Sequence, residues 1–177
     1  RMKLPVSTLY ADERLFGLRY WGTEHDVALY RKCRRLGQLK DLVDSSQESE
    51  RAWRCNSGWV APYKGYPGTD AGDLRKLPFL DAHVIPATNV VLDEQLALTP
   101  YPAAFPNVAF FGERDLYRGP RVLWPDGVNP ELGVKAFYSE APFTFRHSLK
   151  AIGGREEDRA LLQFLAAYLR SSLAHYL

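Results

Sequence analysis

The chain has 177 residues, of which 46% are hydrophobic and 25% charged, so it can form one domain with a hydrophobic core and does not have the composition of a disordered chain. Lys and Arg number 23 and Asp and Glu 21, which leaves a formal net charge of +2. This balance excludes a uniformly basic nucleic-acid-binding protein, but it allows a local basic face.

In chain order, residues 14–22 predict a strand, and residues 24–36 predict a helix with apolar side chains at helical spacing. Thr23 is expected to cap this helix, with Asp26 three residues later in the position of a capping box. Residues 44–50 are polar and without periodicity, which predicts a loop.

The second half of the chain predicts several short strands and one long helix. Strands are expected over residues 77–85, 108–111 and 121–124, and an antiparallel pair over 134–138 and 143–152. From Glu156 to Leu177, apolar residues recur at helical spacing, which predicts an amphipathic helix. The predicted fold class is α+β: a twisted, turn-rich, mainly antiparallel sheet with a capped N-terminal helix and a long C-terminal amphipathic helix.

The sequence gives no sign of a membrane-embedded or secreted protein. No run of about 18 apolar residues is present, so we expect no membrane partner. Cys33 and Cys55 are too few for a disulfide framework, and a cytoplasmic protein with reduced thiols is expected. Because the chain opens on Arg1 and stops at Leu177 inside a helical pattern, we expect residues 1–177 to be a single domain cut from a longer protein.

No catalytic or metal-binding motif is recognisable. The sequence lacks a phosphate-binding loop, a dinucleotide fingerprint, a nucleophile elbow and a helical zinc motif. The four histidines are scattered, and none is spaced with a nucleophile or an acid as catalysis would require: His25, His83, His147 and His175. We therefore expect no catalytic residue, no metal and no cofactor in this chain.

Basic residues interleaved with aromatic residues are more informative. One group lies around Trp53 and Trp59, a second between residues 114 and 121, and a third between residues 135 and 150. Binding to DNA needs cations on phosphates and forked arginine donors on base edges, often from glycine-containing loops. Long basic side chains also cover ordinary solvated surfaces, so these groups alone leave both interpretations open.

Four segments in a recognisable order carry a resemblance to a known family. They are residues 110–124 (FFGERDLYRGPRVLW), 135–138 (KAFY), 143–146 (FTFR) and 161–177 (LLQFLAAYLRSSLAHYL). This order resembles the target-recognition domain of adenine-specific DNA methyltransferases in type IIG restriction-modification or related phage-defence systems. The last segment is similar to the helix that closes such regions, with Arg170 where asparagine is usual.

The resemblance implies a DNA-binding domain without chemistry of its own. In that family a separate catalytic domain of the same chain holds S-adenosylmethionine, and the recognition domain binds double-stranded DNA while the target adenine is flipped out. The expected function is therefore the DNA target-recognition domain of an S-adenosylmethionine-dependent methyltransferase.

Eight basic residues in or beside turn-rich segments are the candidate DNA contacts. The candidates for positioning the duplex through phosphates are Arg51, Arg54, Lys64 and Lys150. The candidates for base or phosphate contacts are Arg114, Arg118, Arg121 and Arg146. The alternative is a protein-protein interaction domain in which the aromatic loops of residues 53–66 anchor the partner. A small hydrolase or metal enzyme has no assembled motif in its support.

Overall fold

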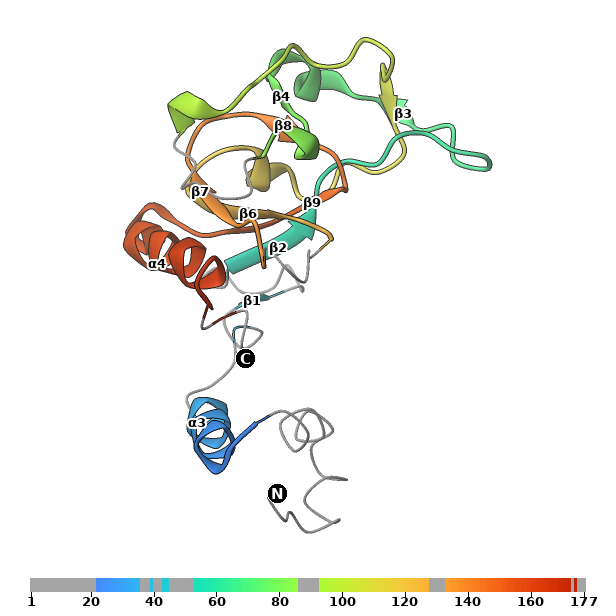
Figure 1. Ribbon diagram of the computed structural model, residues 1–177. Helices are drawn as coiled ribbons and strands as arrows, with labels where there is room; N and C mark the ends of the chain where they lie inside the picture. The colour runs from blue at the N-terminus through green and yellow to red at the C-terminus, as the bar shows by residue number, and fades with distance from the viewer. Residues whose placement is uncertain are drawn as a thin grey trace. The chain divides into compact units, whose positions relative to one another are not determined.

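The computed structural model divides the chain into two units, Arg1–Asp41 and Leu42–Leu177 (Figure 1). The residues that it describes are 22–35, 39, 43–44, 53–85, 93–127, 133–172 and 174. The strand predicted over 14–22 lies outside the described residues, except for Gly22. The loop predicted over 44–50 also lies outside them, except for Asp44.

The first unit contains one described helix, α3, which spans Glu24–Arg34. Its capping box is present as predicted, because the Thr23 hydroxyl and backbone N–H both donate to the Asp26 carboxylate, at 2.8 Å and 2.5 Å. Val27 and Tyr30 are buried, one helical turn apart. The basic residues of the last turn lie where the helix dipole favours positive charge.

The second unit is built on a five-stranded sheet in the order β1-β2-β9-β6-β7. The strands are β1 (Val43–Asp44), β2 (Trp53–Ser57), β9 (Leu149–Gly153), β6 (Arg121–Pro125) and β7 (Phe137–Ser139). All neighbouring pairs are antiparallel except β1 and β2. The fold is therefore α+β with a mainly antiparallel sheet, as predicted.

Side chains alternate across this sheet and form two hydrophobic cores. Val122 and Ile152 are paired across β6 and β9 and belong to the core on one face, whereas the next pair, Leu123 and Ala151, belongs to the core on the other. This is the period-2 alternation of a sheet that is covered on both sides.

Helix α4 (Arg159–Leu169) covers one face of the sheet and packs against β6 and β7 (Figure 1). Leu162, Leu165 and Ala166 are buried there. The sequence predicted a helix from Glu156, but Glu156–Asp158 form a separate 3-10 turn, η6, and α4 ends at Leu169.

Short elements around a buried tryptophan cover the other face. Trp59 has no exposed surface, and the rings of Phe79, Tyr101 and Phe105 lie 5.5–6.0 Å from it, centroid to centroid. The short strands of this layer are β3 (Thr69–Asp70) with β5 (Asn107–Val108), and β4 (Phe79–Leu80) with β8 (Thr144–Phe145). Its 3-10 helices are η2 (Gly72–Lys76), η3 (Ala82–Val84), η4 (Asp93–Gln95) and η5 (Arg114–Tyr117).

Two strand predictions need correction. Residues 77–85 form only the two-residue strand β4 before turning into η3, because the Asp81 carboxylate accepts a hydrogen bond from the His83 N–H and starts a turn. The predicted pairing of 134–138 with 143–152 does not form either. β7 pairs with β6 and β8 with β4, so partners distant in sequence replace the expected local hairpin.

Arg121 lies in the interior of this unit. Its side chain has no exposed surface, donates to the carbonyl oxygens of Gly119 (2.8 Å) and Ala141 (2.5 Å), and lies 4.3 Å above the Phe143 ring. Burial lowers the pKa of the guanidinium to about 10, opposed by the carboxylate of Asp93. Arg121 therefore remains charged at neutral pH and links two loops that adjoin β6 and β7.

No helix in the described ranges has both the length and the apolar run needed to cross a lipid bilayer.

We predict that Arg121→Lys lowers the free energy of unfolding by about 2–3 kcal/mol, because one ammonium group cannot bond both carbonyls and also stack on the ring. Equilibrium urea denaturation measures this change. Arg118→Lys is the matched control at an exposed position, and its effect should stay below about 0.5 kcal/mol. Equal stability of the two variants would contradict the structural role given to Arg121.

Candidate functional site

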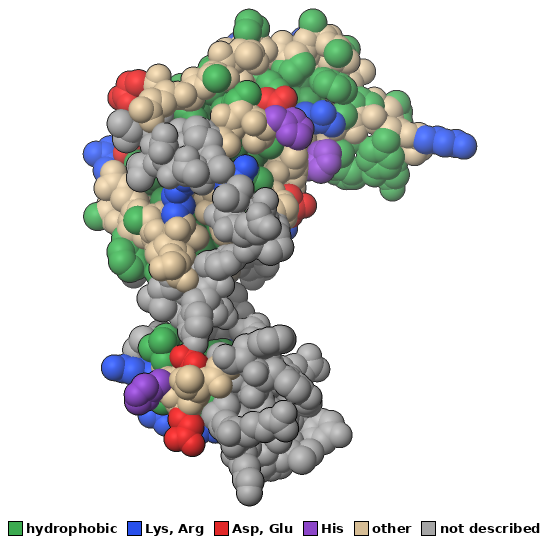
Figure 2. Space-filling view, viewed as in Figure 1, with side chains coloured by type: hydrophobic (Ala, Val, Ile, Leu, Met, Phe, Trp, Pro, Cys, Tyr) green, Lys and Arg blue, Asp and Glu red, His purple; other side chains and the backbone are tan. Residues whose placement is uncertain are grey.

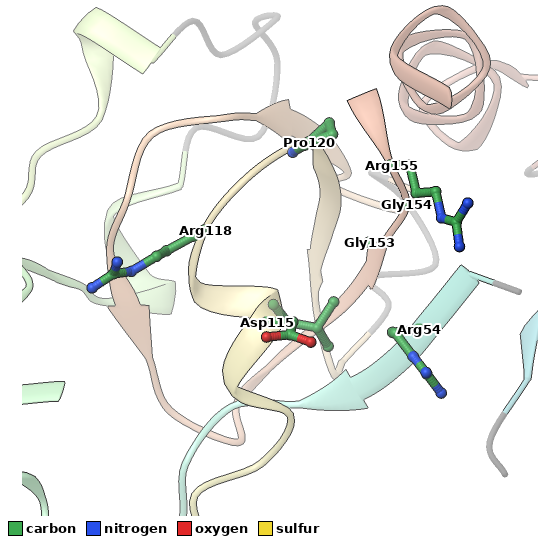
Figure 3. A pocket seen from close by; sticks show the side chains of 8 residues that line it. Arg54, Asp115, Arg118, Pro120, Gly153, Gly154 and Arg155 are labelled. Atoms are coloured by element: carbon green, nitrogen blue, oxygen red, sulfur yellow. The ribbon is translucent and has the colours of Figure 1, made fainter. Parts of the chain in front are cut away.

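Two pockets lie beside the 3-10 helix η5, and arginines line both of them. The arginine pocket, of about 190 Å³, lies between η5 and the ends of β2 and β9 (Figure 3). It is lined by Arg54, Asp115, Leu116, Arg118, Pro120, Gly153, Gly154 and Arg155. The second pocket, of about 380 Å³, is lined by Asp73, Leu74, Leu77, Arg114, Asp115, Tyr117 and Arg118.

The register of the sheet forms one wall of the arginine pocket. Gly153 at the end of β9 pairs with Arg54 on β2 and with Arg121 on β6. A side chain at position 153 would collide with the core, because a Cβ there would lie 2.6 Å from Cδ2 of Leu116. The missing side chain thus lets η5 pack directly on the strand, and the arginine pocket forms at this contact.

Alternation along β2 directs Arg54 toward this pocket. Trp53 and Cys55 pack with the core beneath α4, so the residue between them faces the opposite side of the sheet, where η5 lies. Arg155 reaches the same pocket from the chain that leaves β9. In Figure 3, Arg54 and Arg155 lie on one side of Asp115 and Arg118 on the other.

Burial within η5 directs its polar residues outward. Leu116 and Tyr117 are 1% exposed, and the Tyr117 hydroxyl donates to the carbonyl oxygen of Phe111 at 2.5 Å. Burial also raises the pKa of Tyr117. With these two side chains held inside, Arg114, Asp115 and Arg118 are exposed.

The two pockets are lined by more positively than negatively charged side chains. The lining includes four arginines and two aspartates: Arg54, Arg114, Arg118, Arg155, Asp73 and Asp115. The Lys76 ammonium lies 2.7 Å from the Asp73 carboxylate and lowers the pKa of that carboxyl through a hydrogen bond. One of the two acids thus already has a cationic partner, which leaves the region favourable for an anion.

The partners of these arginines differ. Within the described part of the chain, Arg54 and Arg118 make no ion pair. Arg114 lies 4.3 Å above the Phe111 ring, and Arg155 lies 3.7 Å from the Glu157 carboxylate. A guanidinium without a carboxylate partner keeps its forked donors available to phosphate or to a base edge.

The structure therefore brings three of the eight predicted residues together, Arg54, Arg114 and Arg118. Arg155 joins them and was not predicted. The signal that could have found it is its position directly after Gly153 and Gly154, where a strand ends and a helix begins.

The other predicted residues lie elsewhere. Arg121 is buried, so its side chain cannot contact DNA, and the structure corrects that expectation. Arg146 is half-buried, with its guanidinium 5.1 Å from the Phe105 ring and 5.6 Å from that of Trp59, which points to a packing role. Lys150 is exposed and lies 2.6 Å from the Asp126 carboxylate, a pairing that raises the pKa of its ammonium.

Two predicted residues remain. Lys64 lies in an exposed turn and lines neither pocket, and Arg51 lies outside the described residues. The described ranges contain no group of three or more His, Cys, Asp or Glu that could hold a metal ion. Burial raises the pKa of the Cys55 thiol, which disfavours the reactive thiolate.

Comparison of the sequence with protein-family models and with curated proteins finds no match.

A close backbone approach fixes the start of η5. Gly112 has φ +65°, and a Cβ there would lie 2.5 Å from the carbonyl oxygen of Ser57 at the end of β2. Only glycine accepts both this conformation and this contact without strain. The contact places the segment that carries Arg114 against the sheet.

Gly112→Ala is expected to reduce the free energy of unfolding by about 3 kcal/mol, from the left-handed backbone and the clash together. Chemical denaturation followed by fluorescence gives the value. Gly119→Ala provides the comparison, since Gly119 has φ +72° with no atom within 4 Å of an added Cβ, and a loss of only about 1 kcal/mol is expected. Similar losses in both variants would mean that the contact with Ser57 is unimportant.

Proposed function

We propose that the unit formed by residues 42–177 binds double-stranded DNA as the target-recognition domain of an adenine-specific, S-adenosylmethionine-dependent methyltransferase of a restriction-modification or phage-defence system. The observation that carries DNA binding is the clustering of Arg54, Arg114, Arg118 and Arg155 around η5 with few opposing carboxylates. The methyltransferase context comes from the resemblance of the sequence segments.

In this proposal the arginines on the two sides of η5 contact different parts of the DNA. Arg54 and Arg155 extend from the end of the sheet and act as phosphate contacts, which set the register of the domain on the duplex. Arg114 begins the 3-10 turn η5 and Arg118 follows its last residue, and both side chains are exposed. Their forked donors suit guanine edges as well as phosphates.

Catalysis belongs to another domain in this proposal. S-adenosylmethionine and the residues that hold the flipped adenine would lie in the catalytic domain of the same chain, and the described residues supply binding and orientation only. A charge of +2 over the whole sequence suits such a division, because the binding energy comes from a local cluster and not from the overall charge.

The alternative, a protein-interaction domain, has fewer anchors than the sequence suggested. Trp53 and Trp59 are 6% and 0% exposed, so neither can serve as an interface anchor. The alternative now rests on the exposed rings of Tyr63 and Tyr66.

Fluorescence anisotropy with a labelled duplex tests the proposal. Arg118→Gln should weaken duplex binding roughly tenfold, because it removes a charge-assisted contact. The double variant Arg54→Gln, Arg155→Gln should lower the slope of log K against log[salt] by about 1.8 between 50 and 200 mM, at about 0.9 per lost phosphate contact.

The matched control is Lys150→Gln, which removes one charge at the other end of β9. It should change duplex affinity less than about twofold, because Lys150 already pairs with Asp126. Equal losses for Lys150→Gln and Arg118→Gln would exclude the arginine pocket as the centre of binding. Absence of salt-dependent binding by the unaltered chain would exclude DNA binding altogether and favour a protein partner.

A further inference from the structure

Three half-exposed aromatic rings form a continuous row outside the arginine cluster. Tyr63, Tyr66 and Phe110 are 49%, 51% and 49% exposed. The ring centroids of Tyr63 and Tyr66 lie 4.9 Å apart, and those of Tyr66 and Phe110 lie 5.7 Å apart. We call these three side chains the aromatic ladder. Contiguous exposed rings of this kind usually mark a binding surface.

The ladder is built on a projecting loop whose base is firmly held. Tyr63 and Tyr66 exchange backbone hydrogen bonds of 3.1 Å and 2.8 Å across a tight turn in which Gly65 has φ +89°. The loop extends outward beside β3 in Figure 1, and Figure 2 shows hydrophobic side chains gathered on it.

A neighbouring segment clamps the loop and supplies the third ring. Val60 N–H donates to the Phe110 carbonyl oxygen at 2.9 Å, and Ala109 N–H donates to the Val60 carbonyl oxygen at 2.8 Å. Gly68 has φ +78° and lies so close to the carbonyl oxygen of Val108 that a Cβ would come within 2.5 Å. The rings are therefore presented by an ordered backbone, which lowers the entropy lost when they bind.

The charges around the ladder favour a polyanion. Residues 58–69 and 99–112, which form the loop and its clamp, contain Lys64 and no Asp or Glu. Two acids flank these ranges in sequence: Asp70, which lies 2.9 Å from the guanidinium of Arg75, and Glu113, which is half-buried and follows Gly112. A nucleic acid can therefore approach the rings without meeting an unpaired carboxylate from this segment.

The ladder also adjoins the arginine cluster along the chain. Phe110 is followed by Phe111, whose ring lies 4.3 Å beneath the Arg114 guanidinium. A strand of DNA held at η5 would thus meet aromatic rings next to the cations. Rings beside cations are the combination that binds unpaired nucleobases, since every base has a π-face to stack.

We propose that the aromatic ladder stacks on an unpaired nucleobase of the bound DNA, beside the phosphates held at η5. The proposal rests on the DNA binding proposed above. In a paired duplex each base is covered by its neighbours, so the ladder acts where a base is unpaired and its face is free to stack.

The test compares two duplexes of the same sequence, one fully paired and one with a single bulged adenine, by fluorescence anisotropy with the full chain. We expect the unaltered protein to bind the bulged duplex about tenfold more tightly than the paired one. Tyr66→Ala should abolish this preference and leave affinity for the paired duplex within about twofold. Tyr66→Trp should retain the preference, and Tyr66→Leu should lose it, because leucine keeps an apolar side chain but has no π-face.

Phe164→Ala is the matched control, since Phe164 is 64% exposed on α4 and its ring stacks on Tyr168. It should leave the preference unchanged. Equal affinity of the unaltered protein for both duplexes, or a preference that survives Tyr66→Ala, would overturn the ladder proposal while leaving duplex binding intact. Failure to bind either duplex in a salt-dependent manner would instead overturn the proposed function, and the ladder would then be a surface for a protein partner.

Discussion

The buried guanidinium of Arg121 ties together the loops on which the candidate site depends. It bonds the carbonyl of Gly119, next to Arg118, and the carbonyl of Ala141, next to β7, and it stacks on Phe143. Asp93 holds the same region through the backbone N–H groups of Glu140 and Ala141, at 3.0 Å and 3.2 Å. A buried cation needs several polar partners to offset its lost hydration. Both loops therefore present a carbonyl oxygen to the same guanidinium. These bonds fix the direction in which the chain leaves η5.

Four arginines of this unit illustrate two different environments. Arg121 and Arg146 lie against aromatic rings in the interior, where their carbon and guanidinium atoms contribute to packing. Arg54 and Arg118 line a pocket and make no ion pair among the described residues. The same residue type thus serves as core in one place and as candidate ligand contact in another.

The aromatic residues divide in the same way. Trp59 is the centre of the core that supports η5, while Tyr63 and Tyr66, only a few positions later, are half-exposed on a projecting turn. Between them the chain leaves the core through the contact of Val60 with Phe110. Two segments joined by that contact, residues 59–66 and 110–118, therefore carry the buried aromatic centre, the aromatic ladder and part of the arginine cluster. The arginine cluster carries the proposal of a nucleic-acid ligand, and the ladder adds a stacking surface to it.

Local patterns in the sequence determined the helices and the fold class. The capping box of α3 and the apolar spacing of α4 involve residues three or four positions apart, so the sequence alone could predict both, although not where α4 begins and ends. Only the tertiary structure decided which arginines are available. Arg121 is buried and bonds the carbonyl of Ala141, twenty residues away, and Arg54 joins Arg155 through the pairing of β2 with β9. Such burial depends on contacts between distant segments, which leave no periodic trace in the sequence.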